Sequence, residues 1–202
     1  MKNKTTFISD GLQIEAIFEK KSSEKGIIIT HPHSLYGGNM YNAIVEVIYR
    51  VYSRNDYSSL RFNFRGVGES QGTYDDGNGE INEVKAAYDF MKENQILHID
   101  LAGYSFGSWV NGKAVNQENS FHNLIMVSPP VSFMDFSKIL PIDNLILTIA
   151  GDRDEFAHLP DLESVQQKLN SNALHCTIEG ADHFYTGYTD ELEKIIMEKS
   201  VF

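Results

Sequence analysis

The sequence predicts an α/β fold in which helices cover both faces of a mostly parallel sheet. Short apolar runs rich in β-branched residues alternate along the chain with segments of helical periodicity. Several of these runs are apolar on both faces, as strands buried between two helix layers are. Repeated strand–helix alternation makes neighbouring strands parallel, so their carboxyl ends share one edge of the sheet. Ligands bind at that edge, and the residues after each strand are therefore the candidates for chemistry.

The predicted elements follow one another along the whole chain. An antiparallel hairpin is expected first, with strands at residues 7–10 and 12–18 joined near Gly11. The later strands are short apolar runs, at residues 27–30, 58–64, 99–102, 124–127, 145–150 and 175–178. Apolar side chains three and four residues apart predict helices between them, at residues 44–52, 81–91, 162–169 and 192–196. With no repeat or low-complexity linker, a single domain over residues 1–202 is expected.

Composition and charge limit the classes of partner that the chain is expected to bind. The 17 basic and 28 acidic residues give a net charge of −11, which disfavours binding to nucleic acid or to an anionic membrane. The longest apolar runs, residues 26–29 and 145–150, are too short to span a bilayer. The opening residues MKNKTTFISDG hold no apolar segment, so no signal peptide is expected. The one cysteine, Cys176, excludes an internal disulfide and fits a cytoplasmic location.

Residues 101–110, LAGYSFGSWV, place a serine between two glycines where a predicted strand meets a helical run. In a sharp turn, side chains at positions 103 and 107 would collide with neighbouring backbone, and Gly103 and Gly107 avoid that collision. Ser105 would then lie at the edge of the sheet in a strained conformation, as a nucleophile does. The alternative is that Ser105 only caps the helix that follows it.

Two further strand ends carry the partners that a serine nucleophile needs. The strand at 145–150 is followed by Asp152 and Asp154, and the strand at 175–178 is followed by His183. A serine, an acid and a histidine thus fall in chain order at three strand ends of one sheet. A serine hydroxyl becomes a good nucleophile when a histidine takes its proton and an acid orients that histidine. The combination favours the nucleophile over the cap.

The stretches HPHSLYGGNM, RFNFRGVGESQG and GYSFG resemble those of small, lid-less bacterial α/β-hydrolases, relatives of dienelactone hydrolases and of the prolyl-oligopeptidase-like catalytic domain. The likeness runs from about Gly26 to His183 and implies the α/β-hydrolase fold. Larger relatives carry a lid after the sixth strand. Here only residues 131–143 lie between two predicted strands, too few for a lid domain, so an open and shallow site is expected.

The resemblance also implies roles for individual residues. Ser105 matches the nucleophile and His183 the general base. The family's acid stands three residues after the glycine that ends its strand, which selects Asp154, with Asp152 as the alternative. The oxyanion donors match the backbone N–H groups of His33 and Phe106. No metal or organic cofactor is implied.

These roles predict a cytoplasmic serine hydrolase that cleaves a small carboxylic ester or thioester through an acyl-enzyme intermediate. A serine peptidase of the prolyl-oligopeptidase type is an alternative, because such relatives use the same triad. A non-catalytic binding protein on the same fold and a perhydrolase activity are two others. The intact set of serine, acid and histidine argues against the pure binding protein. The acyl group, the leaving group and the oligomeric state stay open.

Two other motifs resemble ligand-binding sites, but the residues around them disfavour that function. His31 and His33 have the spacing of metal ligands, but no carboxylate or cysteine accompanies them, so His31 is expected to form structural hydrogen bonds at its strand end. The run RGVGESQG resembles a dinucleotide-binding fingerprint, yet Gln71 stands where the third glycine belongs. The family resemblance makes this run a structural loop in which Arg65 holds nearby loops together.

The remaining candidates are apolar or histidine side chains near the predicted strand ends. Those after the sixth strand are equally compatible with a pocket wall and with ordinary packing: Phe133, Met134, Phe136, Ile139 and Leu140. Tyr36 and Phe184 carry the same ambiguity. Trp109 is expected in the core, and His158 and His175 are expected to be surface or strand residues without a catalytic role.

Overall fold

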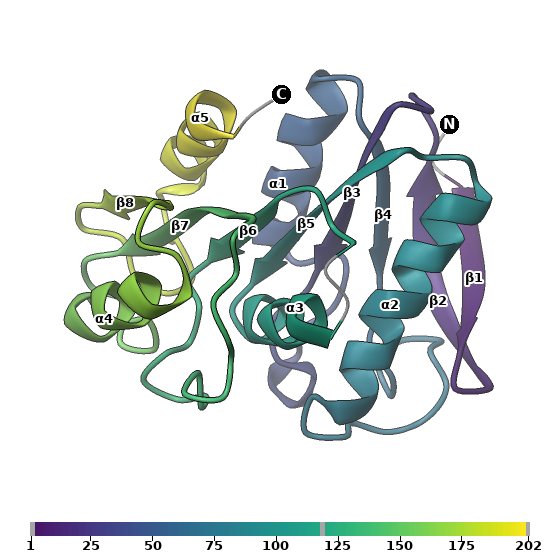
Figure 1. The fold of residues 1–202 in the computed structure, drawn as a ribbon, viewed down its shortest axis with the longest axis horizontal. Helices are drawn as coiled ribbons and strands as arrows, with labels where there is room; N and C mark the ends of the chain where they lie inside the picture. Colours follow the sequence, from purple (N-terminus) through teal and green to yellow (C-terminus); the bar gives the residue numbers. More distant parts are fainter. Residues whose placement is uncertain (1–2, 118–119, 201–202) are drawn as a thin grey trace.

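A computed structural model describes residues 3–117 and 120–200 of the chain (Figure 1). Its strands are β1 (Asn3–Ser9), β2 (Leu12–Glu19), β3 (Lys25–Thr30), β4 (Ser58–Phe62), β5 (His98–Tyr104), β6 (Leu124–Val127), β7 (Leu145–Gly151) and β8 (Leu174–Ile178). Its helices are α1 (Ala43–Arg54), α2 (Asn78–Glu93), α3 (Phe106–Gln117), α4 (Leu159–Leu169) and α5 (Thr189–Lys199), with a short 3₁₀ turn, η1 (Ser34–Tyr36).

The described strands form one sheet in the order β1-β2-β4-β3-β5-β6-β7-β8. β1 pairs with β2, and β2 with β4, in antiparallel fashion, whereas the other neighbours are parallel. The first hairpin turns at Asp10 and Gly11, which both have positive φ, as a tight two-residue turn requires. The predicted hairpin and the predicted mostly parallel sheet are therefore confirmed.

Helices cover both faces of the sheet (Figure 1). The strands alternate their side chains between the two faces: Ile28 packs with residues of α2 and α3, while Ile27 and Ile29 pack with residues of α1 and α5. The helix α4 lies on the same side as α2 and α3, where Leu169 joins their core cluster. No helix in the described ranges is long and apolar enough to cross a membrane.

Among the differences between predicted and observed strand ends, two bear on the site edge. The strand expected at 58–64 ends at Phe62, because the backbone N–H of Phe64 donates to the His31 ring (Nε2, 3.0 Å) and not to a neighbouring strand. The strand expected at 99–102 continues to Tyr104, so that Gly103 still pairs with Thr30 in β3. These contacts bring the segment after β4 and the turn after β5 close to the end of β3.

Arg65 connects the loop after β4 with α2 and with the first hairpin, as the family resemblance implied. Its Nε donates to Glu83 of α2 at 2.6 Å, its backbone N–H donates to the same carboxylate at 3.0 Å, and its guanidinium reaches Asp10 in the first hairpin at 3.3 Å. Glu83 is fully buried. Burial raises the pKa of Glu83 to about 7, although the hydrogen bonds and charge of Arg65 act in the opposite direction.

Replacing Arg65 by methionine is expected to destabilise the protein more at pH 8 than at pH 5. The change leaves a buried carboxylate without its cation, a loss of about 3 kcal/mol in the free energy of unfolding at pH 8. A carboxyl whose pKa is raised in the folded protein opposes folding above its unfolded pKa, and the effect is complete only above its folded pKa. At pH 5, Glu83 can take up a proton and the loss becomes smaller.

Urea unfolding of Arg65→Met and wild type at both pH values measures this difference. Arg54→Met serves as a control, because Arg54 is exposed and binds Glu193 at the surface, where an ion pair contributes little. A loss of the same size at pH 5 and pH 8 would show that Glu83 keeps its charge in the variant.

Candidate active site

Ser105 occupies a sharp turn between β5 and α3. Its φ is +54°, in the left-handed region that a non-glycine residue rarely adopts, and its backbone N–H donates to the carbonyl of Val127 at 2.9 Å. A Cβ at Gly103 would lie 2.5 Å from the Ser108 nitrogen, and one at Gly107 would lie 2.7 Å from the His31 carbonyl oxygen. The turn therefore requires both glycines, as the sequence predicted.

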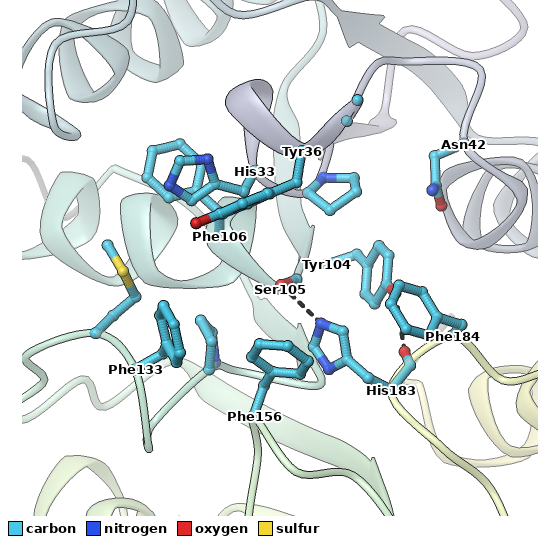
Figure 2. Close-up of a pocket in the computed structure, with 15 residues that line it drawn as sticks. His33, Tyr36, Asn42, Tyr104, Ser105, Phe106, Phe133, Phe156, His183 and Phe184 are labelled. Atoms are coloured by element: carbon cyan, nitrogen blue, oxygen red, sulfur yellow. Dashed lines mark hydrogen bonds between the residues drawn. The ribbon is translucent and has the colours of Figure 1, made fainter.

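The side chains of Ser105, His183 and Asp154 form one continuous chain of hydrogen bonds. Figure 2 shows the bond between Ser105 and His183. The Nε2 atom of His183 lies 2.9 Å from Ser105 Oγ, and its Nδ1 lies 2.9 Å from each carboxylate oxygen of Asp154. The three residues come from the ends of β5, β7 and β8. Each is less than a tenth exposed, so little water competes for these bonds. The capping role weighed for Ser105 is not what its hydroxyl does, since that group is bonded to the imidazole.

The geometry also separates the two aspartates that the sequence left open. Asp154 Oδ1 accepts from the backbone N–H groups of Phe156 and Ala157, at 2.9 Å each, which aims the carboxylate at the histidine. Asp152 Oδ1 accepts from the backbone N–H of Gly180 at 2.7 Å. Asp152 thus holds the loop that carries His183, while Asp154 contacts the imidazole itself.

Two buried residues behind Asp154 were missed by the sequence reading. The Ser128 hydroxyl lies 2.8 Å from that of Tyr185, and both residues are fully buried with positive φ, +44° and +53°. Backbone strain of this kind gathers at functional sites. Ser128 directly follows β6, so its position at a strand end was a signal for it in the sequence. Tyr185 carries no such signal, because only the fold brings it to Ser128.

These surroundings keep Asp154 ionised. Burial by itself would raise the pKa of this carboxyl, but the hydrogen bond and charge of His183, with further hydrogen bonds from Ser128 and from the Ala157 N–H, hold it below its usual range. An ionised carboxylate fixes the tautomer of the imidazole by accepting from Nδ1. Tyr104, another residue that the sequence reading missed, donates its hydroxyl to the His183 carbonyl at 2.8 Å and steadies the same loop.

The backbone on the other side of Ser105 comes from the loop after β3 and from the start of α3. His33 is the cap of η1, and its ring accepts from the Leu35 N–H at Nδ1 (3.3 Å) and lies 3.2 Å from the Tyr74 hydroxyl through Nε2. Phe106 is the first residue of α3, so its N–H has no acceptor inside the helix. Both residues line the cavity that contains Ser105.

His31 has the structural role that the sequence predicted. It is fully buried, with Nδ1 at 2.6 Å from the Pro32 carbonyl and Nε2 accepting from the Phe64 N–H. Burial lowers the pKa of His31 to about 4, so the ring is neutral at physiological pH. Because backbone groups occupy both ring nitrogens, His31 has none left with which to join His33 as a metal ligand.

Ser105 and His183 face a cavity of about 530 Å³, large enough for a small organic substrate. The structure divides the apolar candidates after β6: Phe133 and Met134 line the cavity, Phe136 and Ile139 are buried in the core, and Leu140 is exposed. Tyr36 and Phe184 also line the cavity. Trp109 lies in the core cluster as expected. His158 pairs with Asp161 at the surface and His175 with Thr148, and neither reaches the cavity.

No family model matches the chain. The chain is similar to an uncharacterised protein of Rickettsia prowazekii, with 34% identity over 196 residues that cover 91% of this chain and 82% of that protein. A solved α/β serine hydrolase homologue from Coxiella burnetii superposes with a TM-score of 0.91, at 29% identity over 98% of this chain and 97% of that one. A lid-less α/β serine hydrolase from Xanthomonas campestris gives 0.89, at 25% identity over 98% and 93%.

These likenesses extend over nearly the whole chain and agree with its topology. The segment between β6 and β7, where larger relatives carry a lid, contains no helix or strand here. The mostly parallel sheet, the turn at Ser105 and the short segment between β6 and β7 match what the sequence resemblance implied. The chain belongs to the family of small lid-less α/β-hydrolases.

Proposed function

We propose that the protein is a serine hydrolase that cleaves a small carboxylic ester or thioester through an acyl-enzyme intermediate. The observation that carries this proposal is the hydrogen-bonded chain from Ser105 Oγ through both ring nitrogens of His183 to Asp154, open to a cavity at its serine end. This arrangement joins a nucleophile, a base and an orienting acid in the order that nucleophilic catalysis requires.

In the first half of the reaction, Ser105 Oγ attacks the substrate carbonyl carbon while His183 Nε2 takes the hydroxyl proton. Asp154 stabilises the imidazolium that forms. The bond between the acyl carbon and the leaving oxygen or sulfur then breaks, and His183 returns the proton to the departing alcohol or thiol. In the second half, His183 takes a proton from water while the water oxygen attacks the acyl carbon. The bond between that carbon and Ser105 Oγ then breaks, and His183 returns the proton to Oγ, which releases the acid and restores Ser105.

The backbone N–H groups of His33 and Phe106 are proposed to bind the oxyanion formed at each attack. Both residues line the cavity beside Ser105, and Phe106 adds the positive end of the α3 dipole. Rigid donors in a site with little water stabilise this charge strongly, and removing one such donor in other hydrolases lowers the rate by roughly 10²–10³. No step in this mechanism calls for a metal ion or an organic cofactor.

Ester or thioester cleavage fits the cavity better than the alternatives do. A peptidase that selects a free amino terminus uses carboxylates to bind it, and no aspartate or glutamate is among the cavity-lining residues in the described part of the chain. A pure binding protein would have no use for the strained Ser105 and its bonded imidazole. A perhydrolase reaction would need peroxide, and peroxide dependence separates it from hydrolysis. A small-molecule substrate and a cytoplasmic location stay predictions from the sequence.

An activated Ser105 is expected to react with a fluorophosphonate. Intact mass spectrometry should find a single adduct on the wild-type protein and none on Ser105→Ala or His183→Ala, because the first variant lacks the nucleophile and the second lacks its base. Circular dichroism of both variants checks that they fold. If none of the three proteins forms an adduct, the proposed function is wrong.

Exchanging carboxylate for amide at the two aspartates is expected to give unequal losses. Asp154→Asn should lower the turnover of p-nitrophenyl acetate by about 10⁴, the loss seen when the acid of such a triad is replaced in a serine protease. Asp152→Asn should cost less than about tenfold, since an amide oxygen can still accept from the Gly180 N–H. Equal or reversed losses, with both variants folded, would contradict the assignment of Asp154.

A further inference from the structure

Aromatic rings form one side of the cavity as a connected wall. The His33 ring lies 4.9 Å from that of Tyr36 and 4.8 Å from that of Phe106, measured between centroids. These three residues, which we call the Tyr36 wall, come from the loop after β3 and the start of α3. Because each ring packs on another, the wall presents fixed aromatic surface to the space above Ser105.

A second connected set of rings faces the first. The Phe133 ring lies 5.5 Å from that of Phe156, which lies 4.7 Å from the His183 imidazole. Phe133 and Phe156, here called the Phe133 wall, come from the loops after β6 and β7. Figure 2 shows Ser105 between the two walls, so that the nucleophile opens into a slot with aromatic rings on both sides.

Three of the aromatic residues that line the cavity are largely exposed. Tyr36 is 78% exposed, Phe133 67% and Phe184 66%, although each is large and apolar, and each comes from a different loop. All three line the same cavity. Single exposed aromatic residues are common, but several that converge on one cavity mark a binding surface.

The described lining of the cavity also lacks the cationic side chains that would bind a phosphate group. No lysine or arginine of the described residues lines it, and the chain carries a net charge of −11. A phosphate-bearing leaving group, such as coenzyme A, would approach a negatively charged protein without a cation at the site to hold it. The electrostatics thus favour an uncharged substrate.

The position of His183 assigns the two halves of a substrate to two ends of the cavity. His183 Nε2 must give its proton to the leaving group, so the leaving group lies on the His183 side of Ser105. In Figure 2, Phe184 lies on that side, whereas Tyr36, Phe106 and Phe133 lie on the other. The acyl group is therefore the part that enters between the Tyr36 wall and the Phe133 wall.

We propose that the substrate is an uncharged ester whose acyl group carries an aromatic ring, held between the Tyr36 wall and the Phe133 wall. This inference rests on the proposed serine hydrolase function and narrows its substrate class. An aromatic ring in the slot gains offset or edge-to-face contacts with the rings on both sides, which a saturated ring of the same size does not. A rigid ring also loses less conformational freedom on binding than an alkyl chain does.

A matched pair of esters tests the acyl group. The p-nitrophenyl esters of phenylacetic acid and cyclohexylacetic acid share a leaving group, a carbon count and an unconjugated carbonyl, and differ in aromaticity. We expect kcat/KM to be about tenfold higher for the phenylacetate, each value being divided by that ester's rate of hydrolysis by hydroxide. A ratio at or below one would overturn the proposal.

Substitutions in the two walls test whether these walls cause the preference for an aromatic acyl group. Phe133→Leu and Tyr36→Leu keep an apolar side chain but remove a ring, and each should reduce the ratio to about threefold or less. Leu140→Ala is the matched control, because Leu140 lies in the same loop as Phe133 and is similarly exposed but does not line the cavity. It should leave the ratio and both rates unchanged. A ratio that survives both ring removals would also overturn the proposal.

Labelling by the fluorophosphonate separates this inference from the function on which it rests. If Ser105 is labelled while the ratio is at or below one, the aromatic preference is wrong and the hydrolase assignment stands. If Ser105 is not labelled and neither ester is turned over, both proposals are wrong.

A second pair of substrates tests the preference for an uncharged substrate. The phenylacetyl thioester of N-acetylcysteamine carries the same reacting atoms as phenylacetyl-coenzyme A without the phosphates. At low ionic strength we expect kcat/KM to be at least about tenfold higher for the uncharged thioester. Equal or faster turnover of the coenzyme A thioester would refute the preference for an uncharged substrate.

Discussion

The close approach of α3 to the end of β3 is the constraint on which the rest of the site depends. Gly107 lies so near the backbone of Thr30 and His31 that no side chain fits between them. This approach sets the start of α3 beside the loop that carries His33, and it forces Ser105 into a positive φ. The contact at Gly107 thus brings Ser105 close to both proposed oxyanion donors. The strain at Ser105 is offset by its bonds to the Val127 carbonyl and to His183.

The loops after β7 and β8 position His183 through two acidic residues that make different contacts. Asp154 contacts the imidazole, while Asp152 holds Gly180 and so fixes the path of the chain toward His183. Tyr104 ties the same loop back to β5 through the His183 carbonyl. Because the bonds made by Asp154 and Tyr104 are buried, the imidazole is held in one orientation in the absence of substrate, which is the condition for electrostatic catalysis without reorganisation.

The short connection between β6 and β7 leaves the slot beside Ser105 uncovered. Residues 128–144 contain no helix or strand that could cover the slot, and the proposed recognition surface includes partly exposed aromatic side chains from loops. The rings pack on one another within each wall, so the cavity is formed in the absence of substrate. A site of this kind supports the proposed preference for a rigid, uncharged acyl group.

The sequence by itself determined the sheet, its two helix layers and the three strand ends at which Ser105, Asp154 and His183 stand, because strand alternation and glycine spacing are local properties of the chain. The family resemblance selected Asp154 over Asp152, but the pattern of residues alone left the choice open, since two carboxylates two residues apart differ only in what the folded loops bring to them. The sequence also missed Tyr185 and the pairing of rings into two walls. Such contacts join residues far apart in the chain, and side-chain periodicity carries no information about them. Only the tertiary structure decided which aspartate contacts the histidine and which aromatic residues face Ser105.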